Sequence, residues 1–266
     1  MILKSSSNKD TVYIYQDQGV YKSPCLKEAF IKKFPSLKIK TLNAHHIKND
    51  SWQHTALALV MPGGADVLYC QKLKGKGNRI IKQYVEEGGT YLGFCAGAYY
   101  GTSYCDFAHT LYPNNFSKVL EERELAFYPG TGVGPFLAPY KVNTEIGARI
   151  ALIEWENEKD RSKELYNVYY NGGCYFAHAE LYQNTKVLAY YVHSDLEKQP
   201  AIIESKVNEG KAILCGPHPE VTSAALIKAV KHKTEGWEYL KKTIIPALKD
   251  LKHLTLFQKI VARSWT

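Results

Sequence analysis

Residues 90–100 read TYLGFCAGAYY, and this stretch decides the fold. Thr90 to Phe94 has the composition of a buried strand, and a helix is predicted from about Gly97. Cys95 therefore falls on a strand-to-helix turn, with Gly93 and Gly97 two residues away on either side. Such glycines remove side chains that would collide with a nucleophile held in a rare backbone conformation. We expect the thiol to lie at the carboxyl end of a strand, where the helix N-terminus favours thiolate.

Upstream of this turn, short strands alternate with helices. Strands are predicted for residues 11–16, 37–42 and 56–61, and helices for residues 23–34 and 78–87. Ser23 and Pro24 are typical of an N-cap and a first helical residue. The β-α-β order with short connections predicts a parallel sheet covered by helices on both faces, which is a doubly wound α/β fold.

The second half of the chain has a different pattern. Turn residues separate β-rich pieces at 148–155, 166–170, 187–192, 201–206 and 211–215, and the pattern becomes helical from Val221 onward. Closely spaced strands with turns between them predict an antiparallel β extension on the mainly parallel core. We found no repeat or linker, so we expect one domain over residues 1–266, with a core at about 11–223 and C-terminal helices at 224–266.

Composition excludes several classes of protein. The 266 residues are 45% apolar and carry a formal net charge of +8, which argues against disorder. The longest apolar run, Ala56 to Met61, is too short for a membrane span, and the basic residues are scattered rather than clustered as in a nucleic-acid groove. Six cysteines without a C-x-x-C pair, and no signal-like start, predict free thiols and a cytoplasmic location.

A second motif follows another predicted strand. Residues 216–220 read GPHPE, directly after the strand at 211–215. In a doubly wound sheet the carboxyl ends of the strands share one edge, so His218 can meet Cys95 although 123 residues separate them. Glu220 can hold the imidazole in the tautomer whose free nitrogen faces the sulfur. The alternative is a rigid Pro-His-Pro turn without chemistry.

A third motif, MPGGAD at residues 61–66, follows the strand at 56–61. Glycines let backbone N–H groups turn toward a bound carbonyl oxygen. Gly63 or Gly64, together with the N–H of Ala96, could therefore form an oxyanion hole.

These motifs together resemble a known superfamily. GFCAGAYY (93–100), GPHPE and MPGGAD look like the class I glutamine amidotransferase-like proteins, which carry a Cys-His-Glu triad on a flavodoxin-like sheet. PGGAD, the G-x-C-x-G-x-Y form of the turn and YYNGGCYFAHAE (169–180) are most similar to the N-terminal amidotransferase-like domain of eukaryotic-type biotin–protein ligases. The resemblance covers roughly Thr11 to Ser223.

The resemblance implies roles for individual residues. It makes Cys95 the nucleophile, His218 the base and Glu220 the orienting acid, and it implies Gly64 and Ala96 as oxyanion donors. Tyr99 stands where many amidotransferases have Gln, which argues against glutamine as the substrate. The implied substrate-binding residues are Gly63, Tyr99, Asn171, Gly172 and Gly173.

Two functions remain open at this stage. One is a thiol amidase or transferase acting on an amide or a related carbonyl of a small molecule. The other is a catalytically silent binding or regulatory module that works beside a separate biotin–protein ligase. Neither requires a cofactor, a metal, a nucleic acid or a membrane, and the sequence does not give the oligomeric state.

Other polar residues have simpler interpretations. His45 with His46, His178 with Glu180, and His193 with Asp195 match no standard metal-ligand spacing, so surface or turn positions are expected. Cys174 is predicted to be a packed core cysteine, although a second thiol near the pocket is the alternative.

Overall fold

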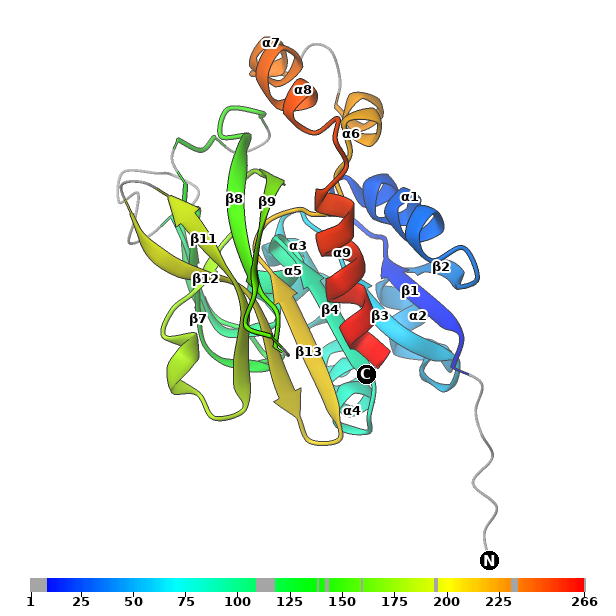
Figure 1. Cartoon of the computed structure of the whole chain (residues 1–266). Helices are drawn as coiled ribbons and strands as arrows, with labels where there is room; N and C mark the ends of the chain where they lie inside the picture. Colours follow the sequence, from blue (N-terminus) through cyan, green and yellow to red (C-terminus); the bar gives the residue numbers. More distant parts are fainter. Residues whose placement is uncertain are drawn as a thin grey trace, which may run out of the picture.

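The computed structural model describes residues 9–108, 118–137, 139–141, 144–158, 160–193, 196–230 and 234–265. Its main element is a nine-stranded sheet of order β2-β1-β3-β4-β13-β12-β11-β8-β9 (Figure 1). The first five strands of that order are parallel, and they are β1 (Thr11–Tyr15), β2 (Lys38–Leu42), β3 (Ala56–Met61), β4 (Thr90–Phe94) and β13 (Gly210–Cys215). This is the strand order of flavodoxin-like sheets, so the predicted fold class is confirmed.

The other half of the sheet is antiparallel, as the turn-separated β pieces predict. It contains β8 (Arg149–Glu156), β9 (Lys163–Tyr170), β11 (Thr185–His193) and β12 (Leu196–Val207). β9 is the last strand in the order, yet Tyr169 near its end forms an isolated antiparallel bridge with His218, just beyond β13. The antiparallel half therefore curls back toward the carboxyl edge of the parallel half.

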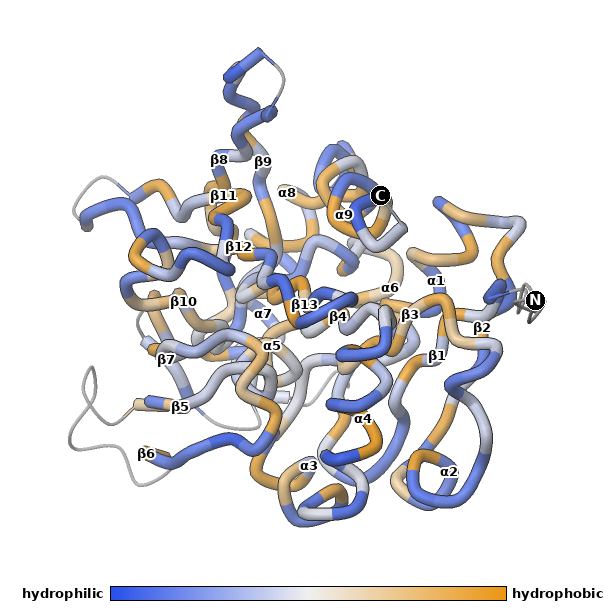
Figure 2. The backbone as a smooth tube through the Cα atoms, turned by 90° about the horizontal axis from the view of Figure 1, so that it is seen from below, coloured by the Kyte–Doolittle hydropathy of each residue, from blue (hydrophilic) through white to orange (hydrophobic). Residues whose placement is uncertain are grey.

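Helices cover both faces of the parallel half because its strands carry apolar side chains on both faces. Val12 and Ile14 of β1 belong to the cluster on the face covered by α1 (Ser23–Lys33) and α9 (His253–Ala262). Tyr15 belongs to the cluster on the opposite face. That face carries α2 (Ala44–Asn49), α3 (Asp66–Leu73), α4 (Lys76–Glu86) and α5 (Ala96–Tyr100). In Figure 2 the hydrophobic colours gather in the central strands, whereas the outer turns of α2 and α4 are hydrophilic.

The remaining helices lie at the carboxyl edge, at the top of Figure 1. They are α6 (Ser223–Ala229), α7 (Trp237–Tyr239) and α8 (Ile245–Ala247), with a π-helical turn at Leu240–Ile244 between the last two. They form a third apolar cluster that includes Tyr169 of β9. Single turns of 3₁₀-helix lie at Trp52–His54, Ala179–Leu181 and Arg263–Trp265.

A second, four-stranded sheet was not predicted from the sequence. Its order is β10-β7-β5-β6, with β5 (Thr102–Phe107), β6 (Val119–Glu122), β7 (Tyr128–Gly134) and β10 (Tyr175–Phe176). β7 reads YPGTGVG, a composition that favours turns rather than strands. Tertiary pairing with β5 and β10 overrides that local preference.

The prediction for the start of α1 was wrong. Lys22, not Ser23, is the N-cap, and its backbone is left-handed at φ 57° with no side-chain cap. The Ser23 hydroxyl instead donates a hydrogen bond to the Gln16 side chain, so it is not available to cap the helix. The sequence also gave no signal for α2 and α3, both of which are shorter than a typical helix.

Candidate active site

Cys95 lies on the predicted strand-to-helix turn, between β4 and α5. Its backbone has φ 49° and ψ −106°, a rare conformation for a residue with a side chain. A Cβ at Gly97 would lie 2.0 Å from the Met61 carbonyl oxygen, and one at Gly93 would lie 2.4 Å from the Gly97 carbonyl oxygen. Both glycines are therefore required for close backbone packing around the turn. The Cys95 N–H donates to the Cys215 carbonyl (2.9 Å), which ties the turn to the end of β13.

His218 and Glu220 lie just beyond β13 and face this turn. The His218 Nδ1 atom lies 2.7 Å from Glu220 Oε1, and the His218 backbone N–H donates to the Tyr169 carbonyl at 2.9 Å. The imidazole and the Cys95 side chain both line the cavity described below. A Cβ at Gly63 would lie 2.5 Å from His218 Cε1 and 3.4 Å from Cys95 Cβ, so this glycine lies against both side chains.

The ionisation of His218 is set by competing effects. Burial lowers its pKa, but the Glu220 carboxylate, together with the charge and hydrogen bond of Cys95, outweighs burial and raises the pKa to about 10. The imidazole is therefore protonated at neutral pH beside the sulfur. A cationic imidazole stabilises a neighbouring thiolate.

The glycine turn after β3 lies beside the thiol. Gly64 has φ +150°, and a Cβ there would lie 1.9 Å from the Gly19 carbonyl oxygen. Hydrogen bonds from Ala65 to Gly19 (2.9 Å) and from Gly97 to Pro62 (3.0 Å) fix the turn against its neighbours. Among the described residues we find no acceptor for the N–H groups of Gly64 and Ala96, and both residues line the cavity described below.

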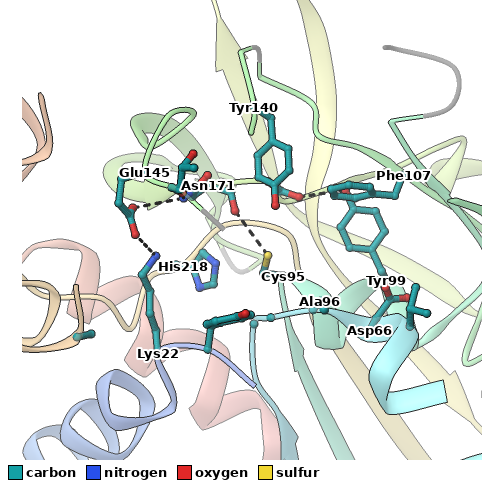
Figure 3. Close-up of a pocket in the computed structure, with 18 of the residues that line it drawn as sticks. Lys22, Asp66, Cys95, Ala96, Tyr99, Phe107, Tyr140, Glu145, Asn171 and His218 are labelled. Atoms are coloured by element: carbon teal, nitrogen blue, oxygen red, sulfur yellow. Dashed lines mark hydrogen bonds and ion pairs between the residues drawn. The ribbon is translucent and has the colours of Figure 1, made fainter. Parts of the chain in front are cut away.

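The segment after β9 also reaches Cys95, through Asn171 (Figure 3). The Asn171 carbonyl oxygen lies 3.9 Å from Cys95 Sγ, and the Tyr99 hydroxyl donates to the Gly172 carbonyl at 3.1 Å. Gly63, Tyr99, Asn171 and Gly172 all line the cavity. Gly173 does not, because it packs against the backbone of Gly216.

A second polar cluster forms the wall near α1, and sequence reasoning missed it. Lys22 Nζ lies 3.0 Å from Glu145 Oε1 and donates to the Tyr169 hydroxyl at 2.8 Å. The Tyr169 hydroxyl and the Asn171 amide both donate to Glu145 Oε2, at 2.6 and 3.3 Å. Burial opposes the charge on Lys22, but Tyr169 and Glu145 raise its pKa above the ordinary value. The cluster supports the loop that holds Asn171 beside the thiol.

Part of this cluster could have been predicted by considering every residue that follows the carboxyl end of a parallel strand. Lys22 follows β1, and the carboxyl end of β1 lies at the same edge as Cys95 and His218. Glu145 had no such signal, because the loop that carries it belongs to no regular element.

The residues surround a cavity of about 480 Å³. Cys95 and His218 are among its lining residues, and the aromatic side chains of Phe107 and Tyr140 stand on the side away from Lys22 (Figure 3). The volume is within the range of small-molecule sites. Cys95 itself is only 6% exposed, so access to the sulfur is through this cavity.

The other cysteines are free and differ from Cys95 in their surroundings. Cys25, Cys105, Cys174 and Cys215 are buried and Cys70 is partly exposed. Burial is the largest cause that raises the pKa of each, to about 12 for Cys25 and Cys70. The prediction that Cys174 packs in the core is confirmed.

His45, His46, His178 and His193 are exposed, as expected. Asp195 lies outside the described residues. Within the described part of the chain no three His, Cys, Asp or Glu side chains gather as metal ligands would. In the same part of the chain, no helix has the length and apolar character needed to cross a bilayer.

The chain belongs to the family described as biotin-protein ligase, N terminal, which matches residues 10–262. It is 36% identical over 216 residues to a biotin–protein ligase of Schizosaccharomyces pombe, covering 80% of this chain but only 33% of the ligase. It is 34% identical over 263 residues to an uncharacterized protein of Chlamydia muridarum, covering 91% of this chain and 96% of that protein. The chain thus spans about a third of the length of the ligase.

Solved structures show the same fold at low sequence identity. A glutamine amidotransferase of Thermotoga maritima superposes with a TM-score of 0.54 at 11% identity, covering 96% of this chain and 98% of that one. PurLQS of Thermotoga maritima gives 0.52 at 14% identity, covering 91% and 100%. The resemblance to amidotransferase-like folds predicted from the motifs is confirmed.

Proposed function

We propose that this protein is a cysteine-dependent amidase or acyltransferase of the amidotransferase-like type, acting in the cytoplasm on a small-molecule amide or related carbonyl. The observation that carries the proposal is that Cys95 and His218, remote in the sequence, line the same cavity, with Glu220 2.7 Å from the His218 ring. A thiol, a base and an orienting carboxylate are the parts that nucleophilic catalysis requires. The one-domain organisation of the chain remains a prediction.

In the proposed reaction, the Cys95 thiolate attacks the carbonyl carbon and forms a C–S bond. The His218 imidazolium gives its proton to the amide nitrogen as the C–N bond breaks, so the amine leaves neutral. Water then donates a proton to His218 and adds its oxygen to the thioester, and the C–S bond breaks. A carboxylic acid leaves, and thiolate and imidazolium are restored. The N–H groups of Gly64 and Ala96 would hold the oxyanion in both steps.

The test is cysteine labelling with iodoacetamide as a function of pH, read peptide by peptide. We expect Cys95 to react first and to keep reacting below the ordinary thiol pKa of ~8.5. Cys70 is the internal control, because it is partly exposed and burial raises its pKa to about 12. His218→Ala should slow labelling of Cys95 near neutral pH and leave Cys70 unchanged. Equal rates at Cys95 and Cys70 in the native chain would reject the enzyme proposal.

A second candidate function is a silent regulatory module that binds a separate biotin–protein ligase. It is favoured by the match of this chain to one third of the Schizosaccharomyces pombe ligase. The test is to measure the rate of a biotin–protein ligase with and without this chain. A concentration-dependent change that persists in Cys95→Ala supports regulation without chemistry, whereas no change removes this candidate.

A further inference from the structure

The side chains that line the cavity around Cys95 indicate what kind of substrate it accepts. We propose that the cavity binds an amide or related carbonyl that carries an uncharged, apolar group, and that this group lies along the aromatic wall formed by Tyr99, Phe107 and Tyr140. This inference rests on the proposed function and adds the substrate class to it.

The aromatic wall is a continuous surface. The ring centroids of Tyr99 and Phe107 lie 5.7 Å apart, and those of Phe107 and Tyr140 lie 5.4 Å apart, both in edge-to-face arrangements. Burial is the main cause that raises the pKa of Tyr140 to about 12, so its ring stays neutral. Figure 3 shows the three side chains together on one side of Cys95. A flat or extended apolar group can contact such a wall over a large area.

The backbone at Gly172 packs directly against the wall. Gly172 has φ +83°, and a Cβ there would lie 2.6 Å from the Tyr140 ring. The Tyr99 hydroxyl is already donated to the Gly172 carbonyl, so Tyr99 presents its ring and not its hydroxyl. Val119 and Val230 also line the cavity and add apolar surface.

The charged groups of the cavity are already paired within the protein. Among the described residues that line it, the ionisable acids and bases besides the cysteine and tyrosines are Lys22, Asp66, Glu145 and His218. Lys22 pairs with Glu145 at 3.0 Å, Asp66 with the buried Arg123 at 2.8 Å, and His218 with Glu220 at 2.7 Å.

This pairing disfavours a charged ligand. A free amino acid such as glutamine brings an ammonium and a carboxylate, and each must lose water when it enters a buried site. Each of these four charged side chains already has a partner of opposite charge in the protein. None is therefore free to compensate a charged ligand for its lost hydration. An uncharged, apolar group meets no such cost and gains contact with the aromatic wall.

The experiment compares three alkylating probes that share one reactive group. They are iodoacetamide, N-phenethyl-iodoacetamide and N-carboxyethyl-iodoacetamide, applied to the native chain at neutral pH. We expect the phenethyl probe to label Cys95 with saturation kinetics, and at low concentration at least about tenfold faster than the carboxyethyl probe. At Cys70 the two probes should react at similar rates. A carboxyethyl probe that labels Cys95 as fast as the phenethyl probe overturns the inference.

A variant series locates the preference on the wall. Phe107→Ala should reduce the phenethyl-to-carboxyethyl rate ratio at Cys95 by about tenfold, and Phe107→Leu by less, because leucine keeps part of the apolar contact. Leu181→Ser is the matched control, since Leu181 is 78% exposed and lies outside the cavity. If the phenethyl-to-carboxyethyl rate ratio is unchanged in Phe107→Leu and in folded Phe107→Ala, the aromatic wall is not the surface that binds the apolar group.

The two proposals fail in different ways. If iodoacetamide itself shows no preference for Cys95 over Cys70, the thiol is not activated and the proposed function fails. If iodoacetamide prefers Cys95 but the phenethyl probe gains nothing over the carboxyethyl probe, only the substrate class fails.

Discussion

Two buried histidines of this chain lie in opposite surroundings. His218 at the candidate site is 5% exposed and has Glu220 at 2.7 Å, whereas His253 at the start of α9 is fully buried. Neither ring nitrogen of His253 has a hydrogen-bond partner among the described residues. Burial lowers the pKa of His253 to about 4, while the pKa of His218 is raised to about 10. Burial alone therefore does not decide the charge of a histidine, because the partner does.

The same contrast separates the two regions. The site is a set of paired polar groups around one cavity, and the α9 region is mainly apolar packing. Phe257 of α9 lies 5.1 Å from Phe30 of α1 and 6.0 Å from Phe94 of β4, measured between ring centroids. We expect changes in the α9 region to alter stability, and changes at the site to alter reactivity.

The largest effect is expected for Phe257→Ala. Loss of a fully buried aromatic ring costs about 3–5 kcal/mol, so the free energy of unfolding should fall by about that amount in urea denaturation. At urea concentrations where Phe257→Ala is still folded, its Cys95 should be labelled at the same rate as in the unchanged chain. Leu181→Ser is the control for both measurements. A changed labelling rate in folded Phe257→Ala would show that the two regions are coupled, contrary to the comparison.

The next effect concerns His253. The pKa of His253 is lowered from 6.5 to about 4, so above pH 6.5 the residue is neutral in both the folded and the unfolded chain and costs no stability. As the pH falls from 6.5 to 4, only the unfolded chain binds the proton, and the free energy of unfolding decreases. That loss should reach about 3 kcal/mol. His253→Leu removes the group, so the slope of unfolding free energy against pH should flatten in this interval. The same slope in both proteins would contradict a neutral, buried His253.

Glu220→Gln should act on reactivity more than on packing, because the amide is nearly isosteric with the carboxylate. Without the carboxylate the pKa of His218 falls, the imidazolium is less populated, and labelling of Cys95 at pH 7 should slow by about tenfold.

The stability of Glu220→Gln should also depend less on pH at the alkaline side. His218 has a raised pKa, so its contribution is complete below pH 6.5 and is lost as the pH rises toward 10. Unfolding curves between pH 7 and 10 measure this loss. If Glu220→Gln shows the same dependence of unfolding free energy on pH between 7 and 10 as the native chain, Glu220 does not raise the pKa of His218.

The smallest effect is expected for Tyr99→Phe. The change keeps the ring but leaves the Gly172 carbonyl without its hydroxyl donor, which should cost about 1 kcal/mol of stability. The phenethyl-to-carboxyethyl preference at Cys95 should be retained, because the ring forms the wall. Loss of that preference would mean that the hydroxyl, and not the ring, determines recognition.

The sequence predicted the part of the fold that follows regular patterns. Alternation of apolar strands and amphipathic helices led to the parallel half, and the three strand-end motifs led to Cys95, His218 and the Gly63–Gly64 turn. These predictions succeed because parallel strands bring their carboxyl ends to one edge whatever lies between them.

The rest depends on tertiary contacts that no local pattern encodes. β7 forms from a glycine- and proline-rich segment only because β5 and β10 pair with it. Glu145 reaches the cavity from an irregular loop, and the left-handed Lys22 is held by partners more than a hundred residues away. Phe107 and Tyr140 become neighbours in the same way.

The curl of the antiparallel half matters for anyone who wishes to shorten this protein. β9 is an edge strand in the order of the sheet, and a truncation design would treat it as dispensable. Its end nevertheless supplies the carbonyl that accepts the His218 N–H, and it leads directly into Asn171 beside the sulfur. A minimal version built from the parallel strands alone would keep the thiol and lose the scaffold that aims the imidazole at it.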